Sequence, residues 1–372
     1  MKIVKQLLLM GMGLVVAANS AEASVTSKPW GTIDGQRVEL FTLTGRSIKV
    51  DVTNFGARIV SIDAPDGNGK DADVVLGYKD LAGYEADKDT YLGSTPGRYA
   101  NRIAGGKFKL DGHTYNIPLN NGANALHGGT IGFDRKVWTA KQVANGVEFT
   151  LVSPDGDMGF PGKLTARVTF TLTGNSLHVV YDATTDKPTV LNLTNHTYFN
   201  LAGEGSGTIL NEVMMINSRK FTPVDANLIP TGKLEPVAGT PFDFTHPTVI
   251  GSRINQDNEQ LKRGGGYDHN YVLEGAAGTM RVAAKVVDPE SGRTLTVSTT
   301  QPGVQFYSGN SLKGQTVGVS GHPYGKNDAF CLETQHFPDS LNHPQFPSTE
   351  LKPGQTFHSE TVFTFGVEAK KP

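Results

Sequence analysis

Residues 192–203 combine one histidine with several amide and hydroxyl side chains, in the sequence N-L-T-N-H-T-Y-F-N-L-A-G. Histidine is the only side chain whose ordinary pKa lies near neutrality, so His196 is a candidate proton donor or acceptor. The apolar residues Val190, Leu191 and Leu193 predict a strand that leads up to it. A structural histidine would fit the same residues, and the two N-x-T patterns here could simply mark a surface loop.

Glu333 is the second candidate for acid–base chemistry. It follows the apolar residues F-C-L, which predict a strand. A carboxyl group in such a strand is costly unless it is paired or functional, and burial raises its pKa. A raised pKa makes a carboxylate a better base toward a hydroxyl group at neutral pH. The alternation of a strand would equally allow Glu333 to face solvent.

Three further stretches place polar side chains beside glycines: G-R-Y-A-N-R-I-A-G-G, L-H-G-G and G-G-G-Y-D-H-N-Y. Arginine and asparagine can donate hydrogen bonds to hydroxyl groups, and a carboxylate can accept from a vicinal diol. Each stretch has a structural alternative, namely a surface arginine at Arg98, a turn histidine in L-H-G-G and a packing or exposed histidine at His269. The stretches supply the candidate binding residues Asn101, Arg102, His127 and Asp268.

The N-terminal residues predict a targeting segment. Lys2 and Lys5 precede an apolar run, and A-E-A at 21–23 has the form of a cleavage site. This pattern is typical of a secretory signal peptide and is too short for a membrane anchor. We therefore expect residues 1–23 to be removed and the mature chain, 24–372, to be periplasmic or secreted.

Composition excludes several classes of function. The net charge of −2 gives no electrostatic footprint for nucleic acid or an anionic membrane. The single Cys331 cannot form an intramolecular disulfide, and no H-E-x-x-H or paired-cysteine pattern indicates a metal site. We expect no metal site, and no nucleic acid or membrane partner.

The remaining sequence predicts strands along its whole length. Apolar residues alternate with polar ones over 38–63, 147–151, 164–172, 177–181, 280–286, 294–300 and 356–367. Turn residues such as Asp111-Gly112 separate these runs, and no segment shows sustained helical periodicity. The absence of a linker composition predicts one all-β domain over 24–372, a large antiparallel β-sandwich.

Six motifs resemble those of the aldose 1-epimerases, or galactose mutarotases. They are N-R-I-A, L-H-G-G, N-L-T-N-H-T-Y-F-N-L-A-G, Y-D-H-N-Y, T-T-Q-P-G-V-Q-F-Y and L-E-T-Q-H-F-P-D-S-L-N-H-P, in this order between about residues 31 and 367. The resemblance implies a supersandwich fold with a sugar site in an open cleft on one sheet. It also implies a free aldohexose as partner and an enzyme without metal or cofactor. The oligomeric state expected is a monomer or a homodimer.

The resemblance also implies roles for residues. Glu333 would take the proton of the anomeric hydroxyl and His196 would protonate the ring oxygen, so that the ring opens and recloses as the other anomer. The implied substrate-binding residues are Asn101, Arg102, His127, Asp268, Gln305 and Tyr198.

Three other interpretations stay open at the level of sequence. A hexose-phosphate epimerase would need several cations in the cleft, and only Arg98 and Arg102 lie near the motifs. A non-catalytic sugar-binding sandwich would be expected to lack Glu333 or His196, and both are present. A glycoside hydrolase needs two carboxylates across the scissile bond, and Asp268 with Glu333 could form such a pair. Loops 203–211 and 255–266 could cover the cleft or join subunits.

Overall fold

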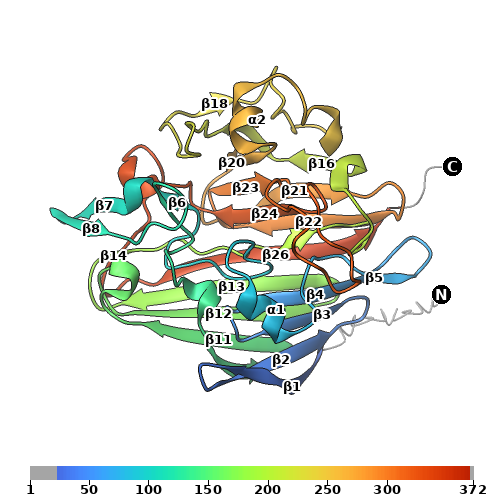
Figure 1. The fold of residues 1–372 in the computed structure, drawn as a ribbon, viewed down its shortest axis with the longest axis horizontal. Coiled ribbons are helices and arrows are strands. Elements are labelled where there is room, and N and C mark those ends of the chain that lie inside the picture. The colour runs from blue at the N-terminus through green and yellow to red at the C-terminus, as the bar shows by residue number, and fades with distance from the viewer. Residues whose placement is uncertain (1–22, 369–372) are drawn as a thin grey trace, which may run out of the picture.

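The computed structural model describes residues 23–368, which are built mainly from antiparallel strands (Figure 1). Of the predicted signal peptide, residues 1–22 lie outside the described residues. No helix in the described range is long and apolar enough to cross a bilayer. The two α-helices of this range are short: α1 (Leu81–Ala86) and α2 (Glu259–Gly264). Its six 3-10 turns are Ala104–Gly106, Phe133–Arg135, Asp157–Gly159, Ile209–Asn211, Ile250–Ser252 and Ser340–Asn342.

Three sheets contain most of the strands. In hydrogen-bonding order, the nine-stranded sheet is β10 (Thr139–Val143), β11 (Gly146–Ser153), β12 (Leu164–Thr173), β13 (Ser176–Thr185), β26 (Phe357–Val367), β22 (Arg293–Thr299), β21 (Arg281–Val287), β16 (Val213–Ile216) and β19 (Thr248–Val249). The six-stranded sheet is β15 (Tyr198–Phe199), β24 (Phe330–Gln335), β23 (Gly303–Tyr307), β20 (Asp268–Leu273), β17 (Ser218–Phe221) and β18 (Glu235–Pro236). The five-stranded sheet is β1 (Ser24–Ile33), β2 (Gln36–Thr44), β3 (Lys49–Thr53), β4 (Arg58–Pro65) and β5 (Asp71–Asp73). Three two-stranded pairs are β6 (Arg102–Ile103) with β9 (Ala125–Leu126), β7 (Lys107–Leu110) with β8 (His113–Asn116), and β14 (Thr189–Val190) with β25 (Glu350–Leu351).

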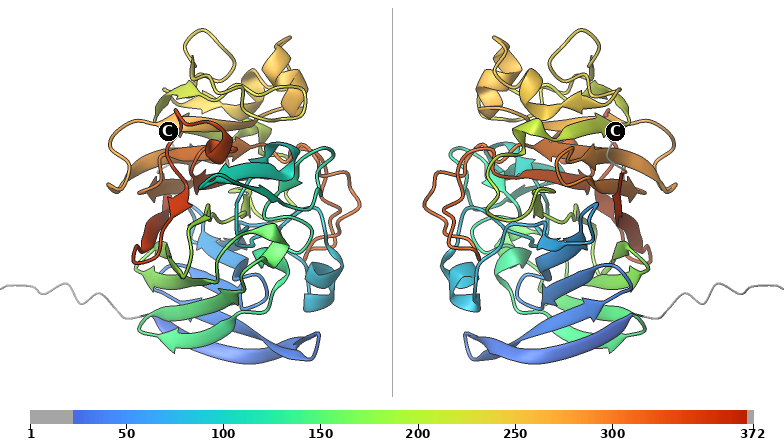
Figure 2. Two further views of the ribbon diagram at one scale, coloured as in Figure 1. Left: turned by 90° about the vertical axis from the view of Figure 1, so that its left-hand side faces the viewer. Right: turned by 90° about the vertical axis from the view of Figure 1, so that its right-hand side faces the viewer.

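The sheets pack face to face as a sandwich. Strands β1, β2 and β4 of the five-stranded sheet contact β11, β12 and β26 of the nine-stranded sheet. The six-stranded sheet contacts the same long sheet further along, where Thr334 of β24 hydrogen-bonds Thr361 of β26 at 2.6 Å. Figure 2 shows the blue and green strands at one end of the molecule and the gold and orange segments at the other. The predicted antiparallel β-sandwich is confirmed.

The two smaller sheets are joined where the chain segment after β5 meets β15. The amide of Leu76 donates to the carbonyl of Tyr198 at 2.9 Å, and Val75 forms an isolated bridge with Phe199. This junction brings β15 beside β24 at one end of the six-stranded sheet. It therefore sets the position of the residues just before β15.

The alternation of apolar residues produces the long strands. Along β12 every second side chain from Leu164 to Leu172 is buried, while the intervening side chains are more exposed. The predicted hairpin of β7 and β8 is also present, and Asp111 and Gly112 have the positive φ angles of 48° and 79° that its tight turn requires. His113 is exposed beside this turn, as predicted.

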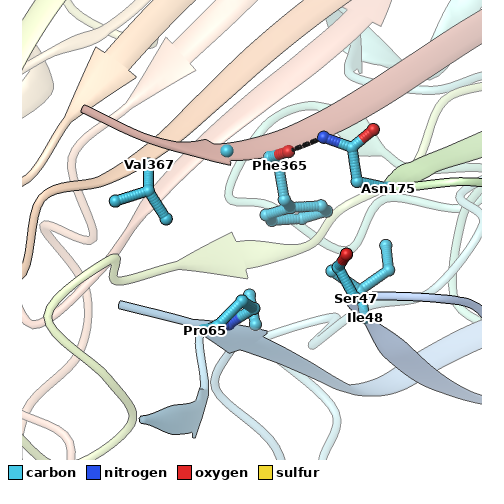
Figure 3. A pocket seen from close by; sticks show the side chains of 8 residues that line it. Ser47, Ile48, Pro65, Asn175, Phe365 and Val367 are labelled. Atoms are coloured by element: carbon cyan, nitrogen blue, oxygen red, sulfur yellow. Dashed lines mark hydrogen bonds between the residues drawn. The ribbon is translucent and has the colours of Figure 1, made fainter. Parts of the chain in front are cut away.

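A small cavity of about 140 Å³ lies between the ends of β3, β4 and β26 (Figure 3). Its walls are made by Ser47, Ile48, Ala64, Pro65, Asn175, Phe365, Gly366 and Val367. None of these side chains titrates near neutrality, so this cavity has no acid–base chemistry.

Candidate active site

A cleft of about 740 Å³ opens on the exposed face of the six-stranded sheet. Strands β20, β23 and β24 supply Asp268, Tyr307 and Glu333 to its walls. Further parts of the walls come from loops around residues 87–91, 120–127 and 310–316. In Figure 2 the cyan and teal loops and the orange loop gather on the same side of the sandwich.

His196 and Glu333 lie together inside this cleft. The sequence around His196 forms a strand only at β14 and again at β15, so His196 lies in an extended segment rather than at the end of the strand predicted there. Strand β15 pairs with β24 through Tyr198 and Cys331, which sets His196 beside Glu333. The His196 Nε2 atom is 3.7 Å from Glu333 Oε1.

Burial shifts the pKa values of this pair in opposite directions. Glu333 is 2% exposed and His196 5% exposed. Loss of hydration, together with the negative charge of Asp268, raises the pKa of Glu333 well above its ordinary value. The same loss of hydration lowers the pKa of His196 to about 4. Both shifts disfavour charge, so a proton shared by the pair is favoured on Glu333 rather than on His196.

A buried thiol lies behind His196. Cys331 Sγ is 3.6 Å from His196 Nδ1, and burial raises the pKa of the thiol well above its ordinary value. The cysteine therefore stays protonated, and its S–H can donate to Nδ1. In the neutral ring the proton is then on Nε2, which faces Glu333. The sequence alone could not predict this contact because it depends on the register of β15 against β24.

Asn192 ties together the segments that carry the candidate residues. Its side-chain nitrogen donates to the carbonyls of Ala100 and His336, at 3.1 and 3.3 Å. Its oxygen accepts from the amide of His336 at 3.0 Å. The loop before Arg102 and the end of β24 are thereby held against the segment that leads to His196.

Arg102 begins β6, which pairs with β9, while Asn101 directly precedes β6 and His127 directly follows β9. Arg102 pairs with Leu126 in this ladder, and the amide of Asn101 donates to His127 Nδ1 at 3.1 Å. Asn101 and His127 have φ angles of 63° and 51°, and Tyr91 across the cleft has 56°. Non-glycine residues adopt such angles at a cost, and they cluster at functional sites.

His127 is a hydrogen-bond donor to the cleft rather than a metal ligand. Coordinating atoms of His127, His196 and Glu333 lie within 4.8 Å of one another, which would suit a metal ion by distance alone. The His127 Nδ1 lone pair, however, already accepts the Asn101 amide proton. Burial holds the pKa of His127 well below its ordinary value, so the neutral ring carries its single proton on Nε2. Neither ring nitrogen then has a lone pair available for a metal.

Asp268 is held by two partners. Gln305 Nε2 donates to its Oδ1 at 2.7 Å, and Arg102 Nη2 lies 3.5 Å from its Oδ2. Gln305 is not among the residues that line the cleft, so its visible contact is with Asp268 rather than with the cavity. Of the eight residues singled out in the sequence, the other seven line the cleft: Asn101, Arg102, His127, His196, Tyr198, Asp268 and Glu333.

Two aromatic residues that line the site, Tyr91 and Tyr307, were not predicted from the sequence. The ring of Tyr91 lies 4.6 Å from that of His127 and 5.9 Å from that of His196. The ring of Tyr307 lies 6.4 Å from His196 and 6.0 Å from Tyr198. Tyr307 could have been found because it lies two residues from Gln305 on the same strand face. Tyr91 lies in a loop without periodicity and gave no such signal.

Loop 255–266 covers part of the cleft, but loop 203–211 does not. Residues 262–265, at the end of α2, belong to the walls, whereas no residue of 203–211 does. The residues between Asn310 and Thr316 provide further cover that the sequence did not predict.

Arg98 is a structural residue. The surface position that its loop allowed is wrong, because Arg98 is 2% exposed. Its guanidinium donates to the carbonyls of Pro161, Gly162 and Ser153. With Arg98 engaged there, it is not among the cationic residues that line the cleft.

His269 is fully buried, packed against the rings of Phe221 and Phe242. It lies 3.2 Å from Gln260 Oε1, and burial lowers its pKa to about 3. It faces the side of β20 opposite to Asp268, so it is a packing residue.

Comparison with known proteins places this architecture in a family. The model of the aldose 1-epimerase family matches residues 39–364. The chain belongs to the aldose 1-epimerase family. It is 46% identical over 330 residues to a galactose mutarotase of Bos taurus, which covers 89% of this chain and 94% of that protein. It is 40% identical over 340 residues to an aldose 1-epimerase of Escherichia coli, covering 90% and 97%.

Solved structures of the aldose 1-epimerase family share the fold. A galactose 1-epimerase from Lactobacillus acidophilus aligns with a TM-score of 0.82 at 29% identity, over 93% of this chain and all of that one. An aldose epimerase homologue from C. elegans aligns with a TM-score of 0.78 at 30% identity, over 87% and 97%. The chain therefore keeps the family sandwich over nearly its whole described length.

Proposed function

We propose that this enzyme interconverts the α and β anomers of free aldohexoses such as glucose and galactose, with Glu333 as base and His196 as acid. The observation that carries the residue assignment is the 3.7 Å separation of His196 Nε2 and Glu333 Oε1 inside the cleft. The anomeric oxygen and the ring oxygen of a sugar are bonded to the same carbon. A base and an acid must therefore be close neighbours to reach both.

The reaction moves one proton from His196 to Glu333 through the sugar. Glu333 removes the proton of the anomeric hydroxyl, the C1–O bond to the ring oxygen breaks, and His196 protonates that oxygen. The open aldehyde rotates about its C1–C2 bond. The reverse transfers then close the ring on the other carbonyl face, so the enzyme returns to its starting state.

Sugar binding supplies the charge distribution that this direction needs. In the free enzyme the proton is favoured on Glu333, because burial raises its pKa and lowers that of His196. A sugar hydroxyl that donates to Glu333 stabilises its carboxylate, and the ring oxygen accepts from a protonated His196. Bound substrate thus moves the shared proton toward the acid.

The surrounding polar groups suit recognition of hydroxyls. His127 presents an Nε2–H donor, Arg102 presents guanidinium donors, and Asp268 is an acceptor held in place by Gln305. Asn101 supports both, since its side chain accepts from the Arg102 amide at 2.9 Å and its own amide bonds His127. Tyr198 supplies an apolar face that a sugar ring can cover.

Polarimetry of freshly dissolved α-D-glucose and α-D-galactose tests this function. Wild type should speed the approach to anomeric equilibrium, and Glu333→Gln and His196→Asn should each lower kcat by roughly 10²-fold or more. Matched substitutions at exposed positions, Glu235→Gln and His113→Asn, should leave the rate unchanged. A wild type that binds sugar without accelerating anomerisation would overturn the proposal.

We also propose that residues 1–23 are a secretory signal peptide and that the mature enzyme is periplasmic or secreted. The basic start, apolar run and A-E-A site support this, and β1 begins at Ser24, so cleavage there leaves the strand intact. N-terminal sequencing of the exported protein should give Ser24 as the first residue. Retention of Met1 on protein confined to the cytoplasm would contradict it.

A further inference from the structure

Buried polar atoms without hydrogen-bond partners extend in a row from Glu333 across strands β24, β23 and β20. Within residues 23–368, Glu333 Oε2 and Gln305 Oε1 have no hydrogen-bond partner, and neither do both amide atoms of Asn270 and of Gln335. Asn270 is 1% exposed and Gln335 is fully buried. The proposed ring opening uses neither amide.

Strand register brings these side chains to one face. Gln305 lies directly opposite both Asn270 on β20 and Glu333 on β24, and Gly303 lies opposite Gln335. Directly opposite residues of antiparallel strands point to the same side of the sheet. Because Glu333 and Gln335 are two residues apart on one strand, they share this face.

Gly303 leaves the space into which the row extends. A Cβ at this position would lie 2.5 Å from Asn270 Oδ1 and 3.0 Å from the ring of Phe337. The amide of Asn270 therefore lies over Gly303, and Phe337, itself 3% exposed, covers the same spot. The aromatic ring separates this end of the row from bulk solvent.

Buried amides without partners are costly, and proteins commonly satisfy such groups with internal water. An internal water needs two to four polar neighbours, and this row offers six unpaired atoms in adjacent positions of one sheet face. We propose that Asn270 and Gln335 hold internal water against Glu333 Oε2, which makes both amides positioning residues for the catalytic carboxyl. This inference rests on the proposed function.

In that arrangement the water is the hydrogen-bond donor to Glu333 Oε2. Glu333 Oε1 faces His196, while Oε2 has no hydrogen-bond donor among residues 23–368. Water held by the two amides donates to Oε2, fixes the rotation of the carboxyl group and stabilises its ionised form. The base is then oriented toward the substrate without a second charged residue.

Two variants with a matched control test this role. Gln335→Met and Asn270→Leu keep shape and remove the amides. Each should lower kcat about tenfold with little change in KM, because a misoriented base affects the reaction more than binding. The alkaline limb of the pH–rate profile should move to higher pH, since the carboxylate loses a donor. Tyr271→Phe removes an unpaired buried hydroxyl from the opposite face of β20 and should leave both kcat and the limb unchanged.

Two further readouts separate this idea from simple packing. A high-resolution crystal structure should show ordered water within hydrogen-bond distance of Glu333 Oε2 and of at least one of the two amides. The unfolding midpoint of Gln335→Met should not rise. A dry row, a raised midpoint and unchanged pH limbs would overturn the inference while leaving mutarotation intact. A wild type without mutarotase activity would instead overturn the proposed function, whatever the crystal shows.

Discussion

Catalysis by His196 and Glu333 needs one titratable proton on the pair, on either residue. Below about pH 4 His196 takes up a second proton, because burial has lowered its pKa to that value. Above the raised pKa of Glu333 the pair loses its only proton. We therefore expect kcat/KM to fall on both sides of a plateau, with the acid limb near pH 4. Initial rates by polarimetry, corrected for the spontaneous reaction at each pH, measure this profile. An acid limb near pH 6.5 would show that His196 titrates as an exposed histidine.

Cys331 should matter through His196 alone. Removal of the thiol in Cys331→Ala leaves His196 Nδ1 without the neighbour that lies 3.6 Å away. The ring is then free to change tautomer, so kcat should fall roughly tenfold with KM little changed. Cys331→Ser retains a donor and should keep most of the activity. Equal rates for the alanine variant and wild type would exclude a role for this contact.

Asn192 holds the segment that leads to His196 against the loop before Arg102 and the end of β24. Asn192→Ala removes three hydrogen bonds and leaves buried backbone groups unpaired. We expect a loss of about 2 to 4 kcal/mol in the free energy of unfolding, measured by urea titration. Asn211→Ala, at an exposed position, should change it by less than about 0.5 kcal/mol. An Asn192→Ala variant as stable as that control would show that the hydrogen bonds of Asn192 are not needed for stability.

The long strands could be predicted because one face of each is buried. Burial on one face forces a period of two, which is visible in β12 and β13, and the glycine turn between them marks the reversal. The short strands β14 and β15 gave no such signal. Their pairing depends on partners more than 100 residues away in sequence, such as Cys331 for Tyr198.

The site could be predicted as a set of residues but not as a geometry. His196, Glu333, Arg102 and Asp268 were recognisable because polar groups beside glycines or within apolar strands need a reason. That Gln305 holds Asp268 rather than lining the cleft depends on register. The part of the cleft wall formed by residues 310–316 is an irregular loop, and its sequence has no pattern that predicts its position.

For the whole molecule, buried carboxyl groups set how stability changes with pH. Glu212 is 2% exposed, and burial raises its pKa well above the ordinary value. A raised pKa in the folded state stabilises the fold below the pKa of the unfolded chain, and this stabilisation is lost as pH rises through the folded value. Glu212→Gln keeps an acceptor for the Leu201 amide and cannot ionise.

The glutamine variant should therefore be more stable than wild type by about 1 to 3 kcal/mol at pH 8. The difference should disappear near pH 4. Urea titrations at both values make the comparison. A constant difference between the two proteins at all pH values would show that Glu212 does not titrate on unfolding.

The expectation of a monomer or homodimer stays a prediction. Light scattering coupled to size exclusion will give the mass of the particle in solution.

The hydrogen bonds of Asn192 also affect the order in which the enzyme folds. Its contact with His336 joins residues 144 positions apart, and the contact of Cys331 with His196 spans 135. Contacts between distant parts of a chain form slowly, because a long loop must close before they stabilise anything. The acid and the base thus come together only when the middle of the chain and its C-terminal part have both been synthesised and docked. During refolding, catalysis should be the last property to return, after the compact sheets have already formed.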